Sequence, residues 1–255
     1  GLLPSDTTYY RANSVATRLE PGDFDFDALF GNDGVRVFNT GGILTLIGAN
    51  TADLAVEAAQ KAAEHGVFVS ADLNYRSKVE PNKDRAQAIN RRLAPYLGLL
   101  VGNDSDLADA LGYETHGAKG DSFDEWLPAY KETIKEVARD FPNLSLIGTQ
   151  WRGARNADII GWGAALYDTL NDEWHVAALR EDIPIRDRTG GGDSFASGVL
   201  SAILKGHDLD TAVNWGAAHG ILVQETAGDT TMVNQATVEK EVARALAGGG
   251  VKATR

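Results

Sequence analysis

Short strand-like segments alternate with helix-like segments along most of this 255-residue chain. Residues 35–40 combine valine, phenylalanine and threonine, residues 51–65 place alanine and leucine at helical spacing, and residues 67–71 again favour a strand. The same alternation predicts strands over 35–40, 67–71, 99–101 and 144–148, and helices over 51–65, 83–95, 105–111 and 123–140. Strands separated by helices are typical of βαβ units, so we expect an α/β fold with a parallel sheet.

The two ends of the chain depart from this alternation. Residues 159–176 favour strands joined by a turn at Asn171-Asp172, and helices are predicted over 193–205, 209–225 and 235–247. Near the start, residues 7–14 resemble a strand that is rich in hydrogen-bonding side chains. An acidic run follows, in which Phe24 and Phe26 fit either core packing or a chance alternation on a solvated face.

Composition excludes several classes of protein. With 43% apolar residues the chain can bury a substantial core in one or two domains. The formal net charge of −12 argues against nucleic acid and against anionic membrane surfaces as partners. There is no apolar run of about 18 residues, and residues 1–20 lack the pattern of a signal peptide. The absence of cysteine excludes disulfides and thiolate chemistry, so we expect a cytoplasmic protein.

Three consecutive glycines stand where an apolar helix is predicted to begin, in Thr189-Gly190-Gly191-Gly192-Asp193. Glycine can adopt positive φ angles and bring bare backbone close to a ligand, while the start of a helix offers free N–H groups to an anion. A carboxylate beside an anion site repels the anion, unless the carboxylate takes a proton from an attacking hydroxyl. Asp193 could instead be an ordinary helix cap, but a cap alone needs none of the glycines.

The same stretch fails to match two well-known glycine motifs and nearly matches a third. A dinucleotide fingerprint would need glycine in place of Phe195, and a P-loop needs a Gly-Lys pair that the chain lacks. The G-x-S-x-G nucleophile elbow misses only its last glycine, so a serine hydrolase that uses Ser194 stays an alternative. Its histidine and acid could come from Asp172 and His175, although these precede the serine.

Polar residues follow three of the predicted parallel strands, at 72–78, 102–104 and 149–152. Ligands of open α/β sheets bind beyond the carboxyl ends of the strands, so we expect these segments to converge. Arg76 is the strongest candidate cation, because a guanidinium can hold a carboxylate or a phosphate through two parallel hydrogen bonds.

Taken together, these segments resemble the ribokinase-like (pfkB-type) carbohydrate kinases. Asp187–Asp193 is similar to the family signature Asp-Thr-x-Gly-Ala-Gly-Asp. Residues 9–14, 72–76 and 215–220 resemble the 2-keto-3-deoxygluconate kinases within that family. The resemblance spans nearly the whole chain and implies a Rossmann-like parallel sheet flanked by helices, with a small β lid. Residues 1–34 would supply the lid and the segment leading into the core, and 35–255 the nucleotide- and sugar-binding core.

The resemblance also implies roles for individual residues. Asp193 would be the general base, and the N–H groups of Gly190, Gly191, Gly192 and Asp193 would form the anion hole. The remaining candidates are Tyr9, Arg11, Asn74 and Arg76 for the sugar acid, Asn103, Thr149, Arg152 and His219 for ATP, and Asp106 for an indirect contact with Mg²⁺. ATP and Mg²⁺ are the implied cofactors, and whether a monovalent cation such as K⁺ binds near Asp187 is left open.

Three departures from the family pattern stand out. Asp106 replaces a glutamate, Gln150-Trp151-Arg152-Gly153 replaces a glycine-rich turn, and the N-terminal strands expected of the family are absent from this chain.

We therefore expect a kinase that phosphorylates the primary hydroxyl of 2-keto-3-deoxygluconate or a close analogue, acting on small molecules as a homo-oligomer, a dimer or higher. The alternatives are a kinase for a neutral sugar such as fructose or ribose, the serine hydrolase, and a non-catalytic binding module.

Overall fold

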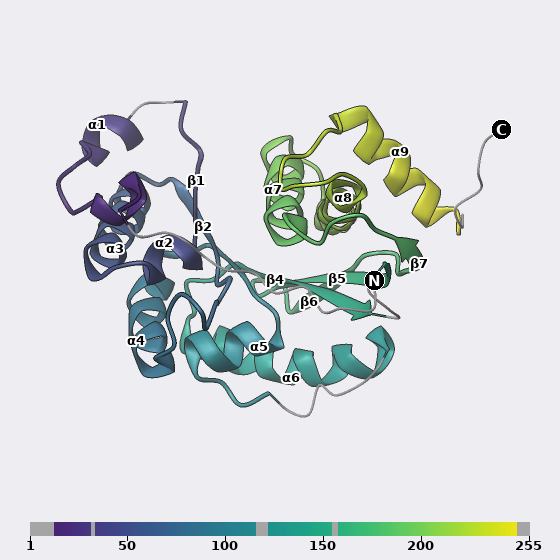
Figure 1. The fold of residues 1–255 in the computed structure, drawn as a ribbon, viewed down its shortest axis with the longest axis horizontal. Coiled ribbons are helices and arrows are strands. Elements are labelled where there is room, and N and C mark those ends of the chain that lie inside the picture. Colours follow the sequence, from purple (N-terminus) through teal and green to yellow (C-terminus); the bar gives the residue numbers. More distant parts are fainter. Residues whose placement is uncertain (1–12, 32–33, 116–121, 155–157, 249–255) are drawn as a thin grey trace.

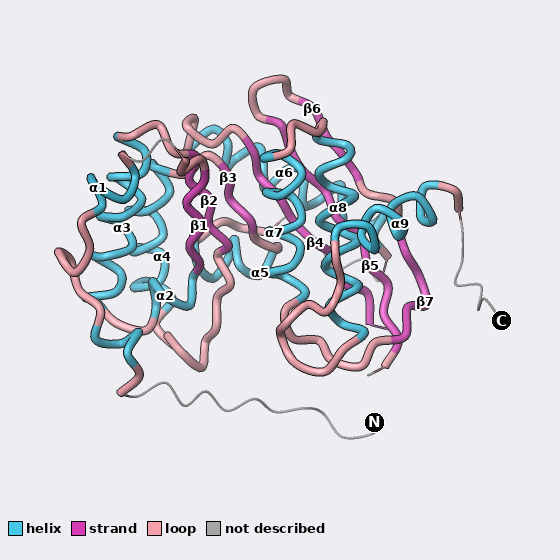
Figure 2. The backbone as a smooth tube through the Cα atoms, turned by 90° about the horizontal axis from the view of Figure 1, so that it is seen from above, coloured by secondary structure: helices cyan, strands magenta, loops and turns pink. Residues whose placement is uncertain are grey.

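The computed structural model describes residues 13–31, 34–115, 122–154 and 158–248. Its centre is a seven-stranded sheet in the order β1-β2-β3-β4-β5-β6, with β7 paired to β5 (Figures 1 and 2). The strands are β1 Val37–Gly41, β2 Phe68–Asp72, β3 Leu99–Val101, β4 Leu146–Ala154, β5 Ile159–Asp168, β6 Glu173–Val176 and β7 Arg180–Pro184. Strands β1 to β4 are parallel, and every pair from β4 onward is antiparallel.

Helices connect the parallel strands, as the alternation predicted. The first half of the chain holds α1 Phe26–Phe30, α2 Gly42–Leu46, α3 Ala49–Glu64, α4 Lys83–Leu93, α5 Asp104–Asp106 and α6 Phe123–Asp140. The second half holds α7 Gly191–Leu204, α8 Leu209–Leu222 and α9 Gln235–Leu246. Short helical turns cover Val15–Arg18, Ala94–Tyr96, Leu107–Leu111 and Val223–Glu225. The predicted α/β class is confirmed: helices link the parallel strands and cover one face of the sheet, and α7, α8 and α9 cover the other face.

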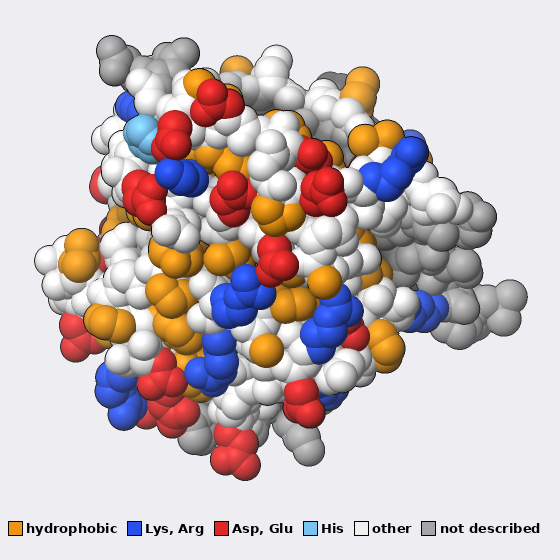
Figure 3. All heavy atoms as spheres, turned by 90° about the vertical axis from the view of Figure 1, so that its left-hand side faces the viewer, with side chains coloured by type: hydrophobic (Ala, Val, Ile, Leu, Met, Phe, Trp, Pro, Cys, Tyr) orange, Lys and Arg blue, Asp and Glu red, His pale blue; other side chains and the backbone are white. Residues whose placement is uncertain are grey.

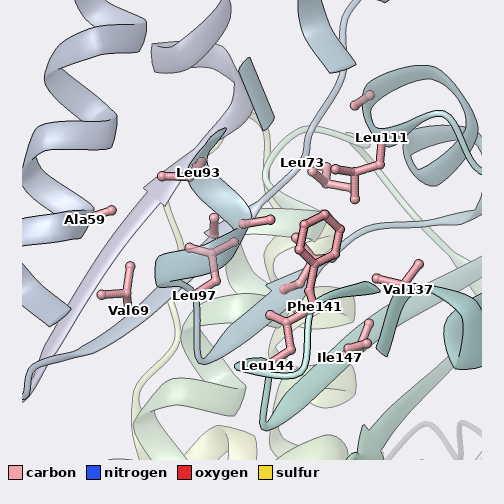
Figure 4. Packing of buried hydrophobic residues seen from close by; sticks show 14 of the residues in the cluster. Ala59, Val69, Leu73, Leu93, Leu97, Leu111, Val137, Phe141, Leu144 and Ile147 are labelled. Atoms are coloured by element: carbon pink, nitrogen blue, oxygen red, sulfur yellow. The ribbon is translucent and has the colours of Figure 1, made fainter. Parts of the chain in front are cut away.

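The sheet separates two apolar cores. Helices α7, α8 and α9 cover one face, and α4, α5 and α6 lie on the other side (Figure 1). Adjacent residues of β3 divide between the cores: Leu99 packs with the α7 and α8 side, and Leu100 with the α6 side. Figure 4 shows part of the second core, where Val137, Phe141 and Ile147 converge. Both faces of the central strands are therefore buried, as a parallel sheet requires.

Several boundaries differ from the prediction. Strand β4 was expected to end at Gly148 but continues to Ala154, because nine of its residues pair with β5. Strand β7 and helices α1 and α2 were not predicted, since each has only five residues and too few positions for a clear periodicity. The predicted turn is confirmed: Asn171 and Asp172 lie between β5 and β6, and Asp172 has a φ of 53°.

The described part of the first 34 residues contains a 3-10 turn and helix α1. Phe26 is buried and stacks on Phe30 at a centroid distance of 5.6 Å, whereas Phe24 is 47% exposed. Residues 7–12 of the expected strand lie outside the described residues, and the division into lid and core stays a prediction. Figure 3 shows the face beside α1 and α3, where acidic and basic side chains are interspersed among hydrophobic ones. None of the described helices is both long and apolar enough to cross a membrane.

Candidate active site

The glycine loop opens helix α7. Gly190 caps the helix with a φ of 83°, and the first helical hydrogen bond runs from the Ser194 N–H to the Gly190 carbonyl oxygen at 2.9 Å. Of the three glycines, Gly190 alone has a positive φ; Gly191 and Gly192 already belong to the helix. The N–H groups of the first helical residues, Gly191 to Asp193, have no acceptor within the helix, so they are donors for an anion.

Close contacts explain why side chains are excluded from this loop. A Cβ at Gly191 would lie 3.1 Å from both Gln224 Nε2 and Trp162 Cη2. A Cβ at Gly192 would lie 3.1 Å from Gln150 Nε2 and 3.5 Å from Asp72 Oδ2. The loop therefore presents bare backbone, held between β4, β5 and the end of β2.

Asp187 anchors the loop from the preceding turn. Its Oδ1 accepts hydrogen bonds from the Thr189 N–H at 3.0 Å and the Thr189 hydroxyl at 2.7 Å, and its Oδ2 accepts one from the Gly228 N–H at 2.9 Å. These bonds, with that from Gly228 the strongest, lower the pKa of Asp187 to about 2. The carboxylate thus ties residues 187–189 to the turn at Gly228.

Three carboxylates face the loop region. Asp72 ends β2 and accepts the Asn74 N–H on Oδ1 at 3.1 Å, which leaves Oδ2 toward Gly192. Asp72 reaches solvent but is surrounded by protein, so burial, together with the charges of Asp106 and Asp193, raises its pKa to about 7. The predicted site residues did not include Asp72, although an acid at the carboxyl end of a central parallel strand is a recognisable signal.

Asp106 and Asn103 form a capping box at the start of α5. Asp106 Oδ2 accepts the Asn103 N–H at 3.2 Å, and Asn103 Oδ1 accepts the Asp106 N–H at 2.9 Å. Asp106 Oδ1 accepts the Tyr75 N–H at 3.0 Å, and burial is the main cause that raises the Asp106 pKa. Through these two bonds Asp106 links the loop after β2 to the loop after β3. Its indirect contact with Mg²⁺ stays a prediction.

Cationic side chains surround the carboxylates. The exposed Arg76 donates to the Tyr75 carbonyl oxygen at 2.8 Å, and its positive charge counteracts the raised pKa of Asp72 and Asp106. Burial lowers the pKa of Arg152, and repulsion by Arg188 and then by Arg76 lowers it further. Arg188 and Arg76 therefore each lie within electrostatic reach of Arg152. The sequence interpretation had not singled out Arg188.

Two residues predicted to contact the nucleotide, Thr149 and His219, lie in different parts of the structure. Thr149 is completely buried, in the register opposite Ala165. Its side chain is therefore part of the core in this conformation. His219 Nδ1 lies 3.0 Å from both the Ser194 carbonyl oxygen and the Ser197 hydroxyl, and burial lowers the His219 pKa. His219 is thus fixed beside the first turns of α7. Tyr9 and Arg11 lie outside the described residues.

The residues of the alternative hydrolase triad do not come together. Asp172 accepts the Tyr167 hydroxyl at 2.7 Å, whereas His175 Nδ1 lies 2.8 Å from Asp210. Within the described ranges, no histidine bonds the hydroxyl of the buried Ser194; His219 contacts its main-chain oxygen instead. A nucleophilic serine needs its base within hydrogen-bond reach, so this geometry disfavours the hydrolase.

Comparisons with known proteins decide the family. The model of the pfkB family of carbohydrate kinases matches residues 161–236, which include the glycine loop and α8. The solved structure of a 2-dehydro-3-deoxygluconokinase from Thermotoga maritima is 30% identical, with a TM-score of 0.83 over 94% of this chain and 69% of that one. The chain belongs to the pfkB family of carbohydrate kinases. The family and the ribokinase-like fold expected from the sequence are thereby confirmed.

Other members of the pfkB family are similar over comparable lengths. A 2-dehydro-3-deoxygalactonokinase from Haloferax volcanii is 27% identical over 246 residues, which is 96% of this chain and 67% of that protein. A pfkB carbohydrate kinase from Listeria grayi is 22% identical and shares the fold, with a TM-score of 0.75 over 89% of this chain and 65% of that one. The chain spans about two thirds of the length of these relatives.

Proposed function

We propose that this pfkB kinase transfers the γ-phosphoryl group of ATP to the primary hydroxyl of a 2-keto-3-deoxy sugar acid. The observation that carries the proposal is the position of Asp193 in the first turn of α7, beside a glycine loop with outward N–H donors. The names of the Thermotoga maritima and Haloferax volcanii relatives support a sugar acid of this class. The configuration of the acid, gluconate or galactonate type, is a matter for a substrate panel.

The proposed reaction assigns one task to each part of the loop. Asp193 accepts the proton of the sugar hydroxyl, whose oxygen forms a bond to the γ-phosphorus as the bond from that phosphorus to the bridging oxygen of ADP breaks. The electron pair of the broken bond leaves with ADP. The N–H groups of Gly191 and Gly192 would stabilise the charge on the transferring group, because they are oriented before the reaction begins.

Mg²⁺ fits the carboxylates of this site as a companion of the nucleotide. Among the described residues there is no group of three or more acidic, histidine or cysteine side chains that could hold a metal by itself. Mg²⁺ commonly binds through one or two carboxylates, water and substrate phosphates, and it neutralises phosphate charge. Asp72 Oδ2 would be the direct or water-mediated contact, and Asp106 would act through water. For a monovalent cation such as K⁺, the supporting observation is the ionised Asp187 at the base of the loop.

The cations favour an acidic sugar over a neutral one. Arg76 stands beside Asp72 and Asp106 with an exposed guanidinium, and a neutral sugar would leave it without an anionic ligand. We assign Arg76, with Arg11 and Tyr9, to the carboxylate end of the substrate, and Asn74 to its hydroxyl groups. The homo-oligomeric state and the cytoplasmic location remain predictions.

The deciding experiment replaces Asp193 by asparagine and measures ADP release with a panel of sugars and sugar acids. We expect wild-type protein to turn over 2-keto-3-deoxy acids, and Asp193→Asn to lower kcat by about 10²- to 10⁴-fold, because the general base is lost. The dissociation constant for ADP should stay within about twofold.

Ser194→Ala is the matched control for this experiment, since the serine is the next residue and is buried. A kinase keeps its kcat in Ser194→Ala, and a serine hydrolase loses it. Undiminished turnover in Asp193→Asn would refute the general-base role. Binding of ligands without any turnover by the wild-type protein would support the non-catalytic alternative.

A further inference from the structure

Arg152 points to the face of the sheet that carries the glycine loop. In the β4–β5 register Arg152 lies opposite Trp162 and Gln150 lies opposite Ala164, and directly opposed residues share a face. Trp162 Cη2 lies 3.1 Å from the Cβ position of Gly191, and Gln150 Nε2 lies at the same distance from that of Gly192. Arg152 therefore rises from the strand beside the two side chains that support the loop.

Arg188 belongs to the turn that leads into the glycine loop. It is the residue before Thr189, in the turn that Asp187 holds through its bonds to Thr189 and Gly228. Arg188 and Arg152 are close enough to repel each other. Two cations are thus brought together at the start of α7 by elements that are distant in the sequence.

No acidic side chain among the described residues forms an ion pair with Arg152. Arg152 is exposed at the surface but partly enclosed by protein, and this enclosure, with the like charges of Arg188 and Arg76, lowers its pKa. Like charges that lie close together are stabilised when an anion binds between them. The positions of the arginines beside the N–H donors of α7 make a phosphate group the matching anion.

The carboxylates of the site would repel a phosphoryl group unless cations offset their charge. Asp72, Asp106 and Asp193 interact electrostatically, and a phosphoryl group held at the loop would lie in their field. The helix start supplies only about half a positive charge to offset this repulsion. Guanidinium groups supply full charges and can bind two oxygens each.

We infer that Arg152 and Arg188 form a clamp on the γ-phosphoryl group of the nucleotide, which positions this group for transfer and stabilises its developing charge. The inference rests on the proposed function and deepens it. It separates the cations into Arg76, which serves the sugar acid, and the Arg152–Arg188 pair, which serves the phosphoryl group.

The test compares nucleotides with and without a γ-phosphate. Dissociation constants for ADP and for the hydrolysis-resistant β,γ-imido analogue of ATP, both with Mg²⁺, are measured by calorimetry for Arg152→Gln and Arg188→Gln. We expect the analogue to bind at least about tenfold more weakly while the ADP constant stays within about twofold. The kcat for phosphoryl transfer should fall by about 10²-fold or more, as when a donor to a developing charge is removed.

Two further sets of variants complete the test. Arg152→Lys and Arg188→Lys keep the charge but lose the paired hydrogen bonds, so they should bind the ATP analogue more tightly than the glutamine variants and more weakly than wild type. If a glutamine variant fails to fold, the lysine variant takes its place in the same comparison with ADP. Arg139→Gln removes an exposed arginine of α6 that donates a hydrogen bond to the Lys135 carbonyl oxygen, and should behave as wild type.

Three results would overturn the clamp: equal weakening of ADP and the analogue, no change in either, or an effect confined to the KM of the sugar acid. The nucleotide comparison needs no turnover. If the wild-type protein binds nucleotide but phosphorylates no sugar acid, the proposed function fails, and the binding constants still decide whether the arginines contact the γ-phosphate.

Discussion

At the scale of single residues, Gly190 shows how backbone conformation and close packing act at one position. Its φ of 83° is unfavourable for any residue with a Cβ, and such a Cβ would also lie 3.2 Å from the Asp229 carbonyl oxygen. Both effects bear on the loop that is proposed to hold the phosphoryl group. The residue therefore supports stability and site geometry together.

The comparison of Gly190→Ala with Gly206→Ala separates these effects. Gly206 has a φ of 79° but no atom within 4 Å of its Cβ position. We expect both variants to lose about 1–2 kcal/mol of unfolding free energy in urea titrations, because both force alanine into the left-handed region. Only Gly190→Ala should also lower kcat, by at least about tenfold, since its contact with Asp229 displaces the loop. Equal kcat in the two variants would contradict this.

Asp187 makes stability depend on pH. Its pKa is about 2 in the folded protein and 3.8 for an ordinary aspartate, so its contribution is fully present above about pH 4 and is lost as the pH falls toward 2. Thermal melts of wild type and Asp187→Asn should therefore converge over this interval, with wild type more stable at pH 5. Parallel curves over the same interval would show that the hydrogen bonds of Asp187 do not favour its ionised form.

At the scale of elements, a buried ionic group fastens helix α9 to strand β7. Glu241 accepts the Arg180 Nε–H at 3.2 Å and two hydrogen bonds from Arg244 at 2.7 and 2.8 Å. Arg180 and Glu241 are 6% and 8% exposed. Removing one partner would leave the other charge buried without compensation, so the pair is costly to break even if its net contribution is small.

We expect Glu241→Ala to lower the free energy of unfolding by about 3 kcal/mol, because Arg180 would stay buried without its carboxylate. Glu239→Ala, on the same helix, removes an exposed carboxylate that bonds Gln235, and should change stability by less than about 0.5 kcal/mol. Urea titrations followed by circular dichroism measure both. A small effect of Glu241→Ala would mean that solvent reaches Arg180 once the glutamate is gone.

The elements also show which predictions a local pattern can support. Helix α6 was predicted with both of its ends. In the structure apolar residues recur along it at helical spacing, and the Ser122 hydroxyl caps its start by accepting the Glu125 N–H. Strand β7 was missed: only Arg180 and Ile183 of its five residues are buried, and it is a strand because β5 offers it a partner. Pairing between distant segments leaves little trace in the local sequence.

At the scale of the whole molecule, one sheet holds two apolar cores in a single cooperative structure. Leu99 and Leu100 are fully buried neighbours on β3 that belong to different cores. We expect Leu99→Ala and Leu100→Ala each to cost about 3–5 kcal/mol, and each to shift one common unfolding transition. Tryptophan fluorescence and circular dichroism should give coincident curves. Separate transitions for the two variants would mean that the faces of the sheet unfold independently.

The site itself belongs to this scale, because each of its parts comes from a different element. The sequence predicts roles for Asp193, the glycines and Arg76 from local signals: a helix start, conformational freedom and a polar segment after a strand. It did not single out Asp72 or Arg188, and the nucleotide contact that it assigned to Thr149 stays a prediction for a side chain that is buried. Those assignments depend on which face of a strand a side chain occupies and on what packs against it.

The sequence by itself determined the alternation of strands and helices, the family and the glycine loop with its carboxylate, since these reside in local periodicity and in one contiguous signature. Only the tertiary structure decided that Asp72 lies against Gly192, that Asp106 accepts hydrogen bonds from two backbone N–H groups, and that Arg188 lies within electrostatic reach of Arg152. The reason is physical. The electrostatics and burial of a side chain are set by neighbours that are distant along the chain, and folding alone brings them together.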